Sequence, residues 1–403
     1  MMQSESFVVK QDINKVSLWK STKPLLGRLD IEITERCNNN CIHCCINLPA
    51  DDADVKEREL SAAEIKSILK EAASLQCIEV RFTGGEPLLR EDFEEVYIFA
   101  RRLGLKVLLF TNATLITPHL AGLFAHTPPL KKIEVTVYGM KKSSYESVTR
   151  VKGSFESAWQ GIHLLMERKI PFVVKGALLP ANKNEIGEFE TWAATIPGMD
   201  KPPTHSMFFD LRCRRDDGEK NRLIEKLRMP AQEGLSVLTR REDNYVKAMK
   251  EFCPKFMRPA GDRLFSCGSG KGSGCVDAYG KFQPCLLLRH PDCAYDLRGG
   301  NLRDALGNFF PKMRERKATD PEYIAKCARC FLKGLCEQCP AKSWTEHGTL
   351  DTPVEYLCAI AHTQARFLGL LKKDEKAWEI KDWQERIQGL AKGRHGYESK
   401  SRA

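Results

Sequence analysis

Three cysteines, Cys37, Cys41 and Cys44, stand at close spacing in the segment Glu-Arg-Cys-Asn-Asn-Asn-Cys-Ile-His-Cys. Three residues separate the first two and two residues separate the last two, directly after a strand-like segment at 29–34. Thiolates hold iron–sulfur clusters, and a cluster held entirely by protein uses four of them. Three thiolates leave one iron open, and an open position is typical of a catalytic metal site. We therefore expect a four-iron cluster whose coordination is completed by a small molecule.

A second motif, Thr-Gly-Gly-Glu-Pro at 83–87, follows the next strand-like segment. Its glycines allow the backbone to approach a ligand closely, and the Glu86 carboxylate can accept a hydrogen bond from a ligand ammonium group. Alone, the motif is also typical of an ordinary turn. In this order the two motifs resemble the radical SAM superfamily, whose members bind S-adenosyl-L-methionine (SAM) through the open iron.

The resemblance implies roles for further residues. Gly84, Gly85 and Glu86 resemble the stretch that holds the methionine amino end of SAM, and Asn112 resembles the asparagine of a Thr-Asn pair on the adenosyl side. In the family reaction, one electron from the cluster cleaves SAM to methionine and a 5′-deoxyadenosyl radical, which abstracts a hydrogen atom from the substrate. Three charged residues near predicted strand ends have no spacing that assigns them a role: Lys175, Asp210 and Arg212.

The first half of the chain alternates strand-like and helical patterns. Alternation of this kind predicts an α/β fold with a parallel sheet and right-handed crossovers, which we expect to curl into a partial, TIM-like (β/α)6 barrel. Both motifs lie at C-terminal ends of strands, where chemistry collects in such barrels. The predicted buried strands are 29–34, 77–82, 106–111, 132–137, 172–176 and 207–211. The predicted helices are 61–75, 91–103, one starting at Ser154, and 185–194.

Capping residues mark several of these helices. Ser61 and Glu64 have the spacing of a capping box at the start of the first helix. Gly104 stands at the expected C′ position of the second, and Ser154 is expected to cap the third. Further along the chain, helical patterns cover 359–371 and 375–390.

A second set of cysteines lies in the C-terminal half of the chain. The segment 276–284 predicts a hairpin that turns near Gly280 and places Cys275 and Cys285 about opposite each other. A close-set group with one later member follows: Cys327, Cys330, Cys336, Cys339 and Cys358. A zinc ribbon is an alternative, although its paired cysteines are normally separated by more residues than here.

This half resembles the SPASM-type auxiliary-cluster domain of radical SAM maturases. By that resemblance, an outer four-iron cluster is held by Cys327, Cys330, Cys336 and Cys358. An inner cluster is held by Cys267, Cys285, Cys339 and a fourth ligand, for which we take Cys275 and keep Cys253 as the alternative. The family usually has three residues before the fourth close-set cysteine, whereas two precede Cys339. Buried inert thiols are the default for Cys45, Cys77, Cys213 and Cys293.

The resemblance covers residues 29–358 and organises the chain into five parts. We expect an N-terminal segment at 1–28, the barrel at 29–217, a helical bridge at 218–252, the auxiliary-cluster domain at 253–371, and a C-terminal helix with a basic tail at 372–403.

The resemblance implies a maturase that oxidatively modifies a peptide or protein, for instance by a thioether or carbon–carbon cross-link in a ribosomally synthesised peptide. Auxiliary clusters with four protein ligands favour electron relay. A sulfatase-maturating, formylglycine-generating enzyme is the alternative. A non-catalytic iron–sulfur electron carrier is a further one, although it has no use for an open iron.

The expected partners are the peptide or protein substrate and a low-potential electron donor of the flavodoxin or ferredoxin type. The 36 residues before Cys37 are too few for a winged-helix module that binds a leader peptide. A substrate with a leader therefore requires a separate leader-binding protein or another surface.

Composition narrows the class of protein. A chain of 403 residues with 42% hydrophobic residues can bury a sizeable core. No apolar stretch approaches the roughly 18 residues of a membrane span, and no signal-peptide core precedes the first motif, so we expect a cytoplasmic protein without a membrane partner. Sixteen cysteines then favour metal or redox use over disulfides. The net charge is +10, and the basic residues are interspersed with acidic ones along the chain. We therefore expect no nucleic-acid partner.

Overall fold

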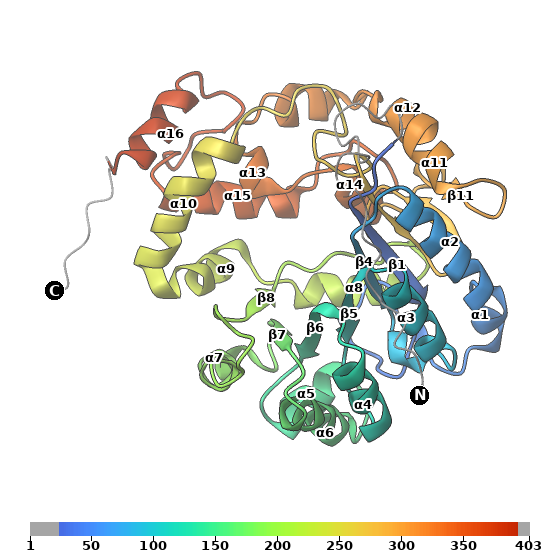
Figure 1. The fold of residues 1–403 in the computed structure, drawn as a ribbon. Coiled ribbons are helices and arrows are strands. Elements are labelled where there is room, and N and C mark those ends of the chain that lie inside the picture. Colours follow the sequence, from blue (N-terminus) through green and yellow to red (C-terminus); the bar gives the residue numbers. More distant parts are fainter. Residues whose placement is uncertain (1–23, 394–403) are drawn as a thin grey trace, which may run out of the picture. The chain divides into compact units, whose positions relative to one another are not determined.

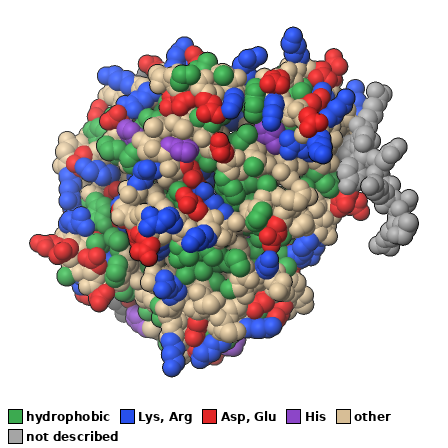
Figure 2. Space-filling view, turned by 180° about the vertical axis from the view of Figure 1, so that it is seen from behind, with side chains coloured by type: hydrophobic (Ala, Val, Ile, Leu, Met, Phe, Trp, Pro, Cys, Tyr) green, Lys and Arg blue, Asp and Glu red, His purple; other side chains and the backbone are tan. Residues whose placement is uncertain are grey.

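The computed structural model describes residues 24–393, which divide into two units. The first unit comprises 24–227 with 268–313, and the second comprises 228–267 with 314–393. The segment 268–313, which the sequence analysis assigns to the auxiliary-cluster domain, therefore belongs to the same unit as the barrel strands. Lys, Arg, Asp and Glu side chains are interspersed over the face of the molecule shown in Figure 2.

A sheet of nine strands, counted within the described residues, forms the centre of the first unit. Six of them pair in parallel in the order β1–β4–β5–β6–β7–β8. Their bounds are β1 Arg28–Thr34, β4 Glu79–Gly84, β5 Lys106–Thr111, β6 Leu130–Val137, β7 Phe172–Ala177 and β8 Thr204–Ser206. This row of consecutive parallel strands confirms the predicted partial barrel.

Helices α2 to α7 lie along the outside of this row of strands (Figure 1). Alternate residues of β1, such as Leu29, Ile31 and Ile33, are fully buried, as expected for a strand covered on one face by helices. The helices of the unit are α1 Ala53–Arg58, α2 Ala62–Ser74, α3 Phe93–Arg102, α4 Pro118–His126, α5 Lys142–Thr149, α6 Ser154–Glu167, α7 Ile186–Ala193, α8 Gly218–Leu227 and α11 Leu302–Asp304, with α12 Phe310–Arg314 at the boundary.

Two of the predicted helix ends are confirmed and one is wrong. The Ser61–Glu64 capping box is present at the start of α2, and Gly104 follows the end of α3 with a φ of 80°. Ser154 is the first residue of α6 and not its cap, because Gly153 takes the N-cap position. The Ser154 hydroxyl instead shares a hydrogen bond of 2.7 Å with the Thr149 hydroxyl.

The sixth strand lies earlier in the chain than predicted. Strand β8 pairs with Lys175–Ala177 of β7 and ends at Ser206, whereas the prediction was 207–211. Met207, Phe209 and Leu211 are all buried, so this loop shows the two-residue period of a strand. Burial of alternate residues in a loop after the strand is the reason for the error.

A hairpin extends the sheet on the other side of β1. Strand β9 (Ser273–Val276) runs parallel to β1, and β10 (Lys281–Gln283) and β11 (Tyr295–Asp296) follow in antiparallel order. Cys275 lies opposite Gln283 and not opposite Cys285, so the predicted pairing of the two cysteines is wrong. The reason is the turn, in which the Asp277 carboxylate accepts hydrogen bonds from the Tyr279 and Lys281 backbone N–H groups.

The second unit is mainly helical. Cys253, Met257, Phe331, Ala361 and Leu368 are among the buried residues of its apolar core. Its α-helices are α9 Ala231–Leu238, α10 Glu242–Phe256, α13 Lys333–Cys336, α14 Pro340–His347, α15 Glu355–Phe367 and α16 Trp383–Ala391. Within 24–393, none of the helices combines the length and apolar character that a membrane crossing requires.

The end of β4 is held tightly against the segment that follows β1. The Gly85 N–H donates to the Thr34 carbonyl oxygen at 2.8 Å, and the Glu86 N–H donates to the Arg36 carbonyl oxygen at 2.9 Å. A Cβ atom on Gly84 would lie 1.9 Å from the Thr34 oxygen, and one on Gly85 would lie 2.1 Å from the Arg36 oxygen. The glycine pair is therefore required by backbone packing at the start of the segment that carries Cys37.

We predict that Gly85→Ala lowers the free energy of unfolding by about 3 kcal/mol, because the added methyl group meets a backbone carbonyl that cannot move aside. Gly187→Ala is the matched control, since a Cβ atom at this position of α7 meets nothing within 4 Å. Urea unfolding monitored by circular dichroism measures both variants. Equal midpoints for the two variants would contradict the packing role of Gly85.

Candidate functional site

A cavity of about 350 Å³ lies at the C-terminal ends of the barrel strands. Strand-end residues that line it include Thr83, Thr111, Thr136, Lys175 and Ser206. Cys37, Cys41 and Cys44 line the same cavity. The structure therefore brings the predicted cysteine trio together at the mouth of the barrel, where the strand ends converge.

The three thiols are buried or half-buried and share one cavity. Burial, together with the neighbouring Cys44, raises the pKa of Cys41 to about 12. Burial likewise raises the pKa values of Cys37 and Cys44, with contributions from adjacent acidic groups and thiols. Thiolates are the ligands of iron, and metal binding displaces their protons. Several buried thiols sharing one cavity therefore fit an iron–sulfur cluster, whose positive irons would stabilise the thiolates.

Glu86 lies behind the cavity wall, although Gly84 and Gly85 line the cavity. Its fully buried carboxylate accepts hydrogen bonds from the Leu88 N–H, the Thr111 hydroxyl and the Asn112 N–H at 3.1, 2.8 and 2.7 Å. Burial raises the pKa of Glu86 to about 7 against these hydrogen bonds. The carboxylate thus joins the ends of β4 and β5, and its contact with a ligand ammonium group stays a prediction.

Asn112 lines the same cavity as the segment 37–47, which carries the three cysteines and is called the cysteine loop. Its amide nitrogen donates to Asn38 Oδ1 at 3.0 Å and lies 3.8 Å from the Sγ of Cys37. Its amide oxygen accepts from the Thr114 backbone N–H and hydroxyl at 2.9 and 2.6 Å. Asn112 therefore links the turn after β5 to the cysteine loop.

Of the three charged residues without an assigned role, two line the cavity. Lys175 forms an ion pair of 2.7 Å with Glu134, and its Nζ lies 3.6 Å from the centroid of the Phe110 ring. Asp210 lies on the same cavity wall. Arg212 is not part of the lining but forms an ion pair of 2.6 Å with Asp216. The cavity therefore offers one paired cation and one carboxylate from this group.

Three aromatic side chains that no sequence pattern predicted form one wall of the cavity. The His43 ring lies 4.9 Å from the ring of Phe209 and 5.7 Å from that of Tyr138, and all three residues line the cavity. Burial lowers the pKa of His43 to about 4, so the ring is neutral at physiological pH. These residues come from three separate segments, and no sequence spacing could have grouped them.

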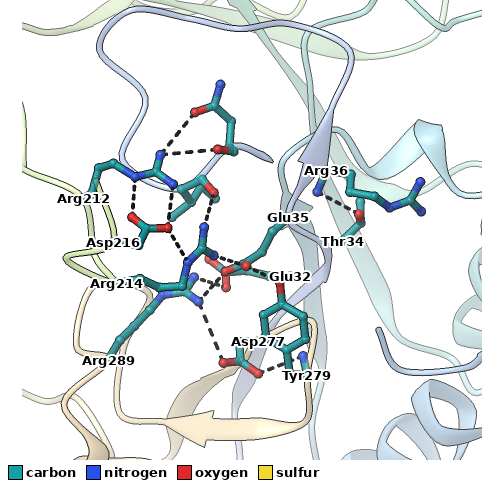
Figure 3. A network of polar contacts seen from close by, with 12 residues as sticks. Glu32, Thr34, Glu35, Arg36, Arg212, Arg214, Asp216, Asp277, Tyr279 and Arg289 are labelled. Atoms are coloured by element: carbon teal, nitrogen blue, oxygen red, sulfur yellow. Dashed lines mark hydrogen bonds and ion pairs between the residues drawn. The ribbon is translucent and has the colours of Figure 1, made fainter. Parts of the chain in front are cut away.

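A buried polar network connects the cysteine loop with the hairpin (Figure 3). Arg289, which follows β10, donates to Glu32 of β1 and, at 2.5 Å, to Glu35 just after β1. Its guanidinium also lies 3.8 Å from the carboxylate of Asp277 in the hairpin turn. The Tyr279 hydroxyl donates to Glu35 at 2.7 Å. Burial alone lowers the pKa of Arg289, but the charges of Glu32 and Glu35 outweigh it and keep the guanidinium protonated.

The same network reaches the segment after β8 (Figure 3). Arg214 pairs with Glu35 and, at 3.0 Å, with Asp216. Arg212 donates to the Asn47 carbonyl oxygen at 3.3 Å, and Arg214 donates to the Ile46 carbonyl oxygen at 3.1 Å. These contacts fix the C-terminal side of the cysteine loop.

A second cavity of about 310 Å³ lies within the second unit. The predicted ligands of the outer auxiliary cluster all line it: Cys327, Cys330, Cys336 and Cys358. Each is partly exposed, and Cys339 is not part of the lining. Burial raises the pKa of Cys336. It also raises the pKa of Cys327, to about 11. The structure thus groups the four cysteines that the sequence analysis assigned to one cluster.

The predicted inner set is divided between the two units. Cys275 and Cys285 belong to the first unit, and Cys267 and Cys339 belong to the second. The alternative ligand Cys253 lies in the apolar core of the second unit. The inner cluster remains a prediction.

The remaining cysteines are Cys45, Cys77, Cys213 and Cys293, and none of the four is in a disulfide. Cys45 lines the barrel cavity, and its backbone oxygen accepts a hydrogen bond of 3.1 Å from the N–H of the buried Cys213. Cys77 and Cys293 are buried outside both cavities. Within the described residues, no three His, Cys, Asp or Glu side chains are grouped as they would be around a single metal ion.

Comparison with protein families identifies one domain. Residues 31–193 match the model of the Radical SAM superfamily. The matched segment contains the cysteine trio, the glycine pair and Asn112.

Among curated proteins, the chain is similar to an AdoMet-dependent heme synthase of Methanosarcina barkeri, with 26% identity over 335 residues that cover 79% of this chain and 92% of that protein. It is also similar to the PqqA peptide cyclase of Gluconobacter oxydans, with 26% identity over 336 residues, 80% of this chain and 88% of that protein. Among solved structures, anSMEcpe with bound AdoMet and the Cp18Cys peptide has a TM-score of 0.58 at 14% identity, covering 92% of this chain and 99% of that one. This last likeness concerns the fold.

We predict that Cys41→Ala removes about four irons per chain, because three thiolates are the only protein ligands expected for the cluster in the barrel. Iron and sulfide analysis after anaerobic reconstitution measures the loss. Cys77→Ala is the control, since it also removes a buried thiol but lies outside the cavity. Unchanged iron in Cys41→Ala would contradict the assignment.

A parallel experiment concerns the second unit. We expect Cys330→Ala to remove about four irons while the iron held by the barrel cysteines remains. Cys77→Ala, which removes a buried thiol of the first unit outside both cavities, is expected to retain all of the iron. Zinc in place of iron in the wild-type protein would contradict the prediction.

Proposed function

A radical SAM domain occupies residues 31–193 of this enzyme, and from that premise we propose that the protein is a maturase that oxidatively modifies a residue of a peptide or protein. The observation that carries the proposal is the presence of two separate cysteine-lined cavities. Three cysteines line the cavity at the barrel strand ends, and four line the cavity of the second unit. The first set suits generation of a radical and the second suits electron relay.

The cofactors of the domain are SAM and a four-iron cluster, which together supply a 5′-deoxyadenosyl radical when bound. Cys37, Cys41 and Cys44 would hold the cluster. The backbone of Gly84 and Gly85 and the side chain of Asn112 would contact SAM. Protein residues otherwise contribute orientation and exclusion of water, which is their usual role around a reactive cofactor.

The size and charge of the barrel cavity support a peptide substrate. Pockets for small ligands occupy about 300–1,000 Å³, so a cavity of about 350 Å³ lies at the small end of that range. A peptide needs to insert only one side chain. Two charged residues of the lining are Lys175 and Asp210, and Lys175 is already paired with Glu134. The cavity therefore does not favour a substrate with many carboxylates.

Oxidative modification leaves an electron to be removed after a hydrogen atom is abstracted. The four cysteines of the second unit would provide every protein ligand of a cluster and leave no open iron. Such a site suits transfer of electrons better than binding of substrate. This supports an oxidative outcome, such as a thioether or carbon–carbon cross-link.

A second candidate is a reaction on a heme-type molecule. The similarity to the AdoMet-dependent heme synthase covers 92% of that protein, which favours this candidate. A sulfatase-maturating activity, with a folded protein as substrate, is a third one that shares the same cofactors.

We expect co-expression with a short Cys-, Thr- or aromatic-rich peptide from a neighbouring reading frame to lower the peptide mass by about two hydrogens. A cross-link between two residues removes two hydrogen atoms, and high-resolution mass spectrometry detects the loss. The Cys41→Ala variant is the control and leaves the mass unchanged.

The purified enzyme distinguishes the candidates further. With a reductant and SAM it should release 5′-deoxyadenosine, and no release under any condition would contradict a radical SAM activity. Release that depends on an iron porphyrin and not on a peptide would replace the proposal with the second candidate. Conversion of a sulfatase Cys or Ser to formylglycine would replace it with the third.

A further inference from the structure

Basic side chains surround the cavity of the four cysteines in the second unit. Two carboxylates, Glu322 and Glu355, also line this cavity. The basic residues of the lining, called here the basic rim, are Lys326, Lys333, Arg366 and Lys376. The rim therefore has more positive than negative groups, and Lys326 is already paired with Glu322 at 2.6 Å.

The rim residues share their cavity with the four cysteines. Lys326, Lys333, Arg366 and Lys376 line the same cavity of about 310 Å³ as Cys327, Cys330, Cys336 and Cys358. Positive charges therefore lie around the site that these cysteines would provide for a cluster.

The rim is also accessible from solvent. Arg366 and Lys376 are exposed, and the Lys326 side chain is 44% exposed. The Lys326 Nζ lies 5.6 Å from the centroid of the Trp378 ring, which lines the same cavity. Positive groups around a small apolar surface are typical of weak, transient encounters between redox proteins, which depend on electrostatic attraction.

We propose that the basic rim is the docking surface for a small acidic electron-transfer protein of the flavodoxin or ferredoxin type. This inference rests on the proposed function, because it takes the four cysteines to hold a redox cluster. One electron passes from the reduced four-cysteine site to the oxidised carrier, which is reduced by one electron. No bond forms or breaks, and no proton moves, in this step. The partly exposed cysteines suit such transfer because the carrier can approach them closely.

Charge reversal at the edge of the rim tests the proposal. We expect Arg366→Glu combined with Lys376→Glu to weaken binding of an acidic flavodoxin about tenfold at low salt, because rim charges govern association. The difference should largely disappear at 0.5 M salt, where exposed charges are screened. Isothermal titration calorimetry of the reconstituted, full-length protein measures the dissociation constant.

The matched control reverses two exposed lysines of the first unit, Lys152→Glu and Lys201→Glu, which changes the net charge equally. We expect this variant to bind flavodoxin like the wild type. Iron analysis shows whether each variant keeps its clusters. If the reversed pair fails to fold or loses iron, Arg366→Gln with Lys376→Gln keeps the measurement possible, with a smaller loss of affinity expected.

Equal binding by the rim variant and the wild type, or equal weakening by the control pair, would overturn the proposal. Binding of an acidic peptide of similar charge with the affinity of flavodoxin would also overturn it, because the rim would then recognise charge alone. Peptide modification driven by a chemical reductant reports on the proposed function independently. A wrong docking surface leaves that modification intact, whereas a wrong function abolishes it while flavodoxin binding can still be measured.

Discussion

The buried guanidinium of Arg289 is the contact on which the arrangement of the first unit depends. Glu32 and Glu35 accept its hydrogen bonds from the end of β1, and Asp277 approaches it from the hairpin. Removing one partner of such a buried pair typically costs about 3–5 kcal/mol, because the other charge stays buried. Arg289 thus connects the strand that leads into Cys37 with the hairpin that carries Cys275. The parallel pairing of β9 with β1 places 268–313 in the same unit as the barrel strands.

The two cysteine cavities have different surroundings, and the difference fits different tasks. The barrel cavity is lined by strand-end hydroxyls and aromatic rings, with a paired lysine and a single aspartate. The cavity of the second unit is lined by four cysteines that are partly exposed and by several basic groups. A site at the barrel strand ends suits positioning of a cofactor and a substrate side chain. A site lined by partly exposed cysteines and basic groups suits exchange of electrons with a soluble partner.

Local sequence patterns were sufficient for most of the barrel. The alternation of apolar residues in β1, the continuous apolar run in β5 and the capping box before α2 depend on neighbours within a few residues, and the structure confirms these elements. Two predictions about strands were wrong. Alternate buried residues gave the loop at 207–211 the pattern of a strand, and side-chain hydrogen bonds of Asp277 set the register of the hairpin. For Glu86, the sequence motif identified the turn after β4. Only the fold shows that the Glu86 carboxylate joins the ends of two strands.

By itself, the sequence determined the cysteine sets and the parallel α/β architecture, because both depend on short spacings and on the period of apolar residues. Only the tertiary structure decided which side chains surround those cysteines. The aromatic wall of His43, Tyr138 and Phe209, the Arg289 network and the basic rim each combine residues that are far apart in the chain. Contacts of this kind arise when strand ends and loops converge, and no local pattern encodes them.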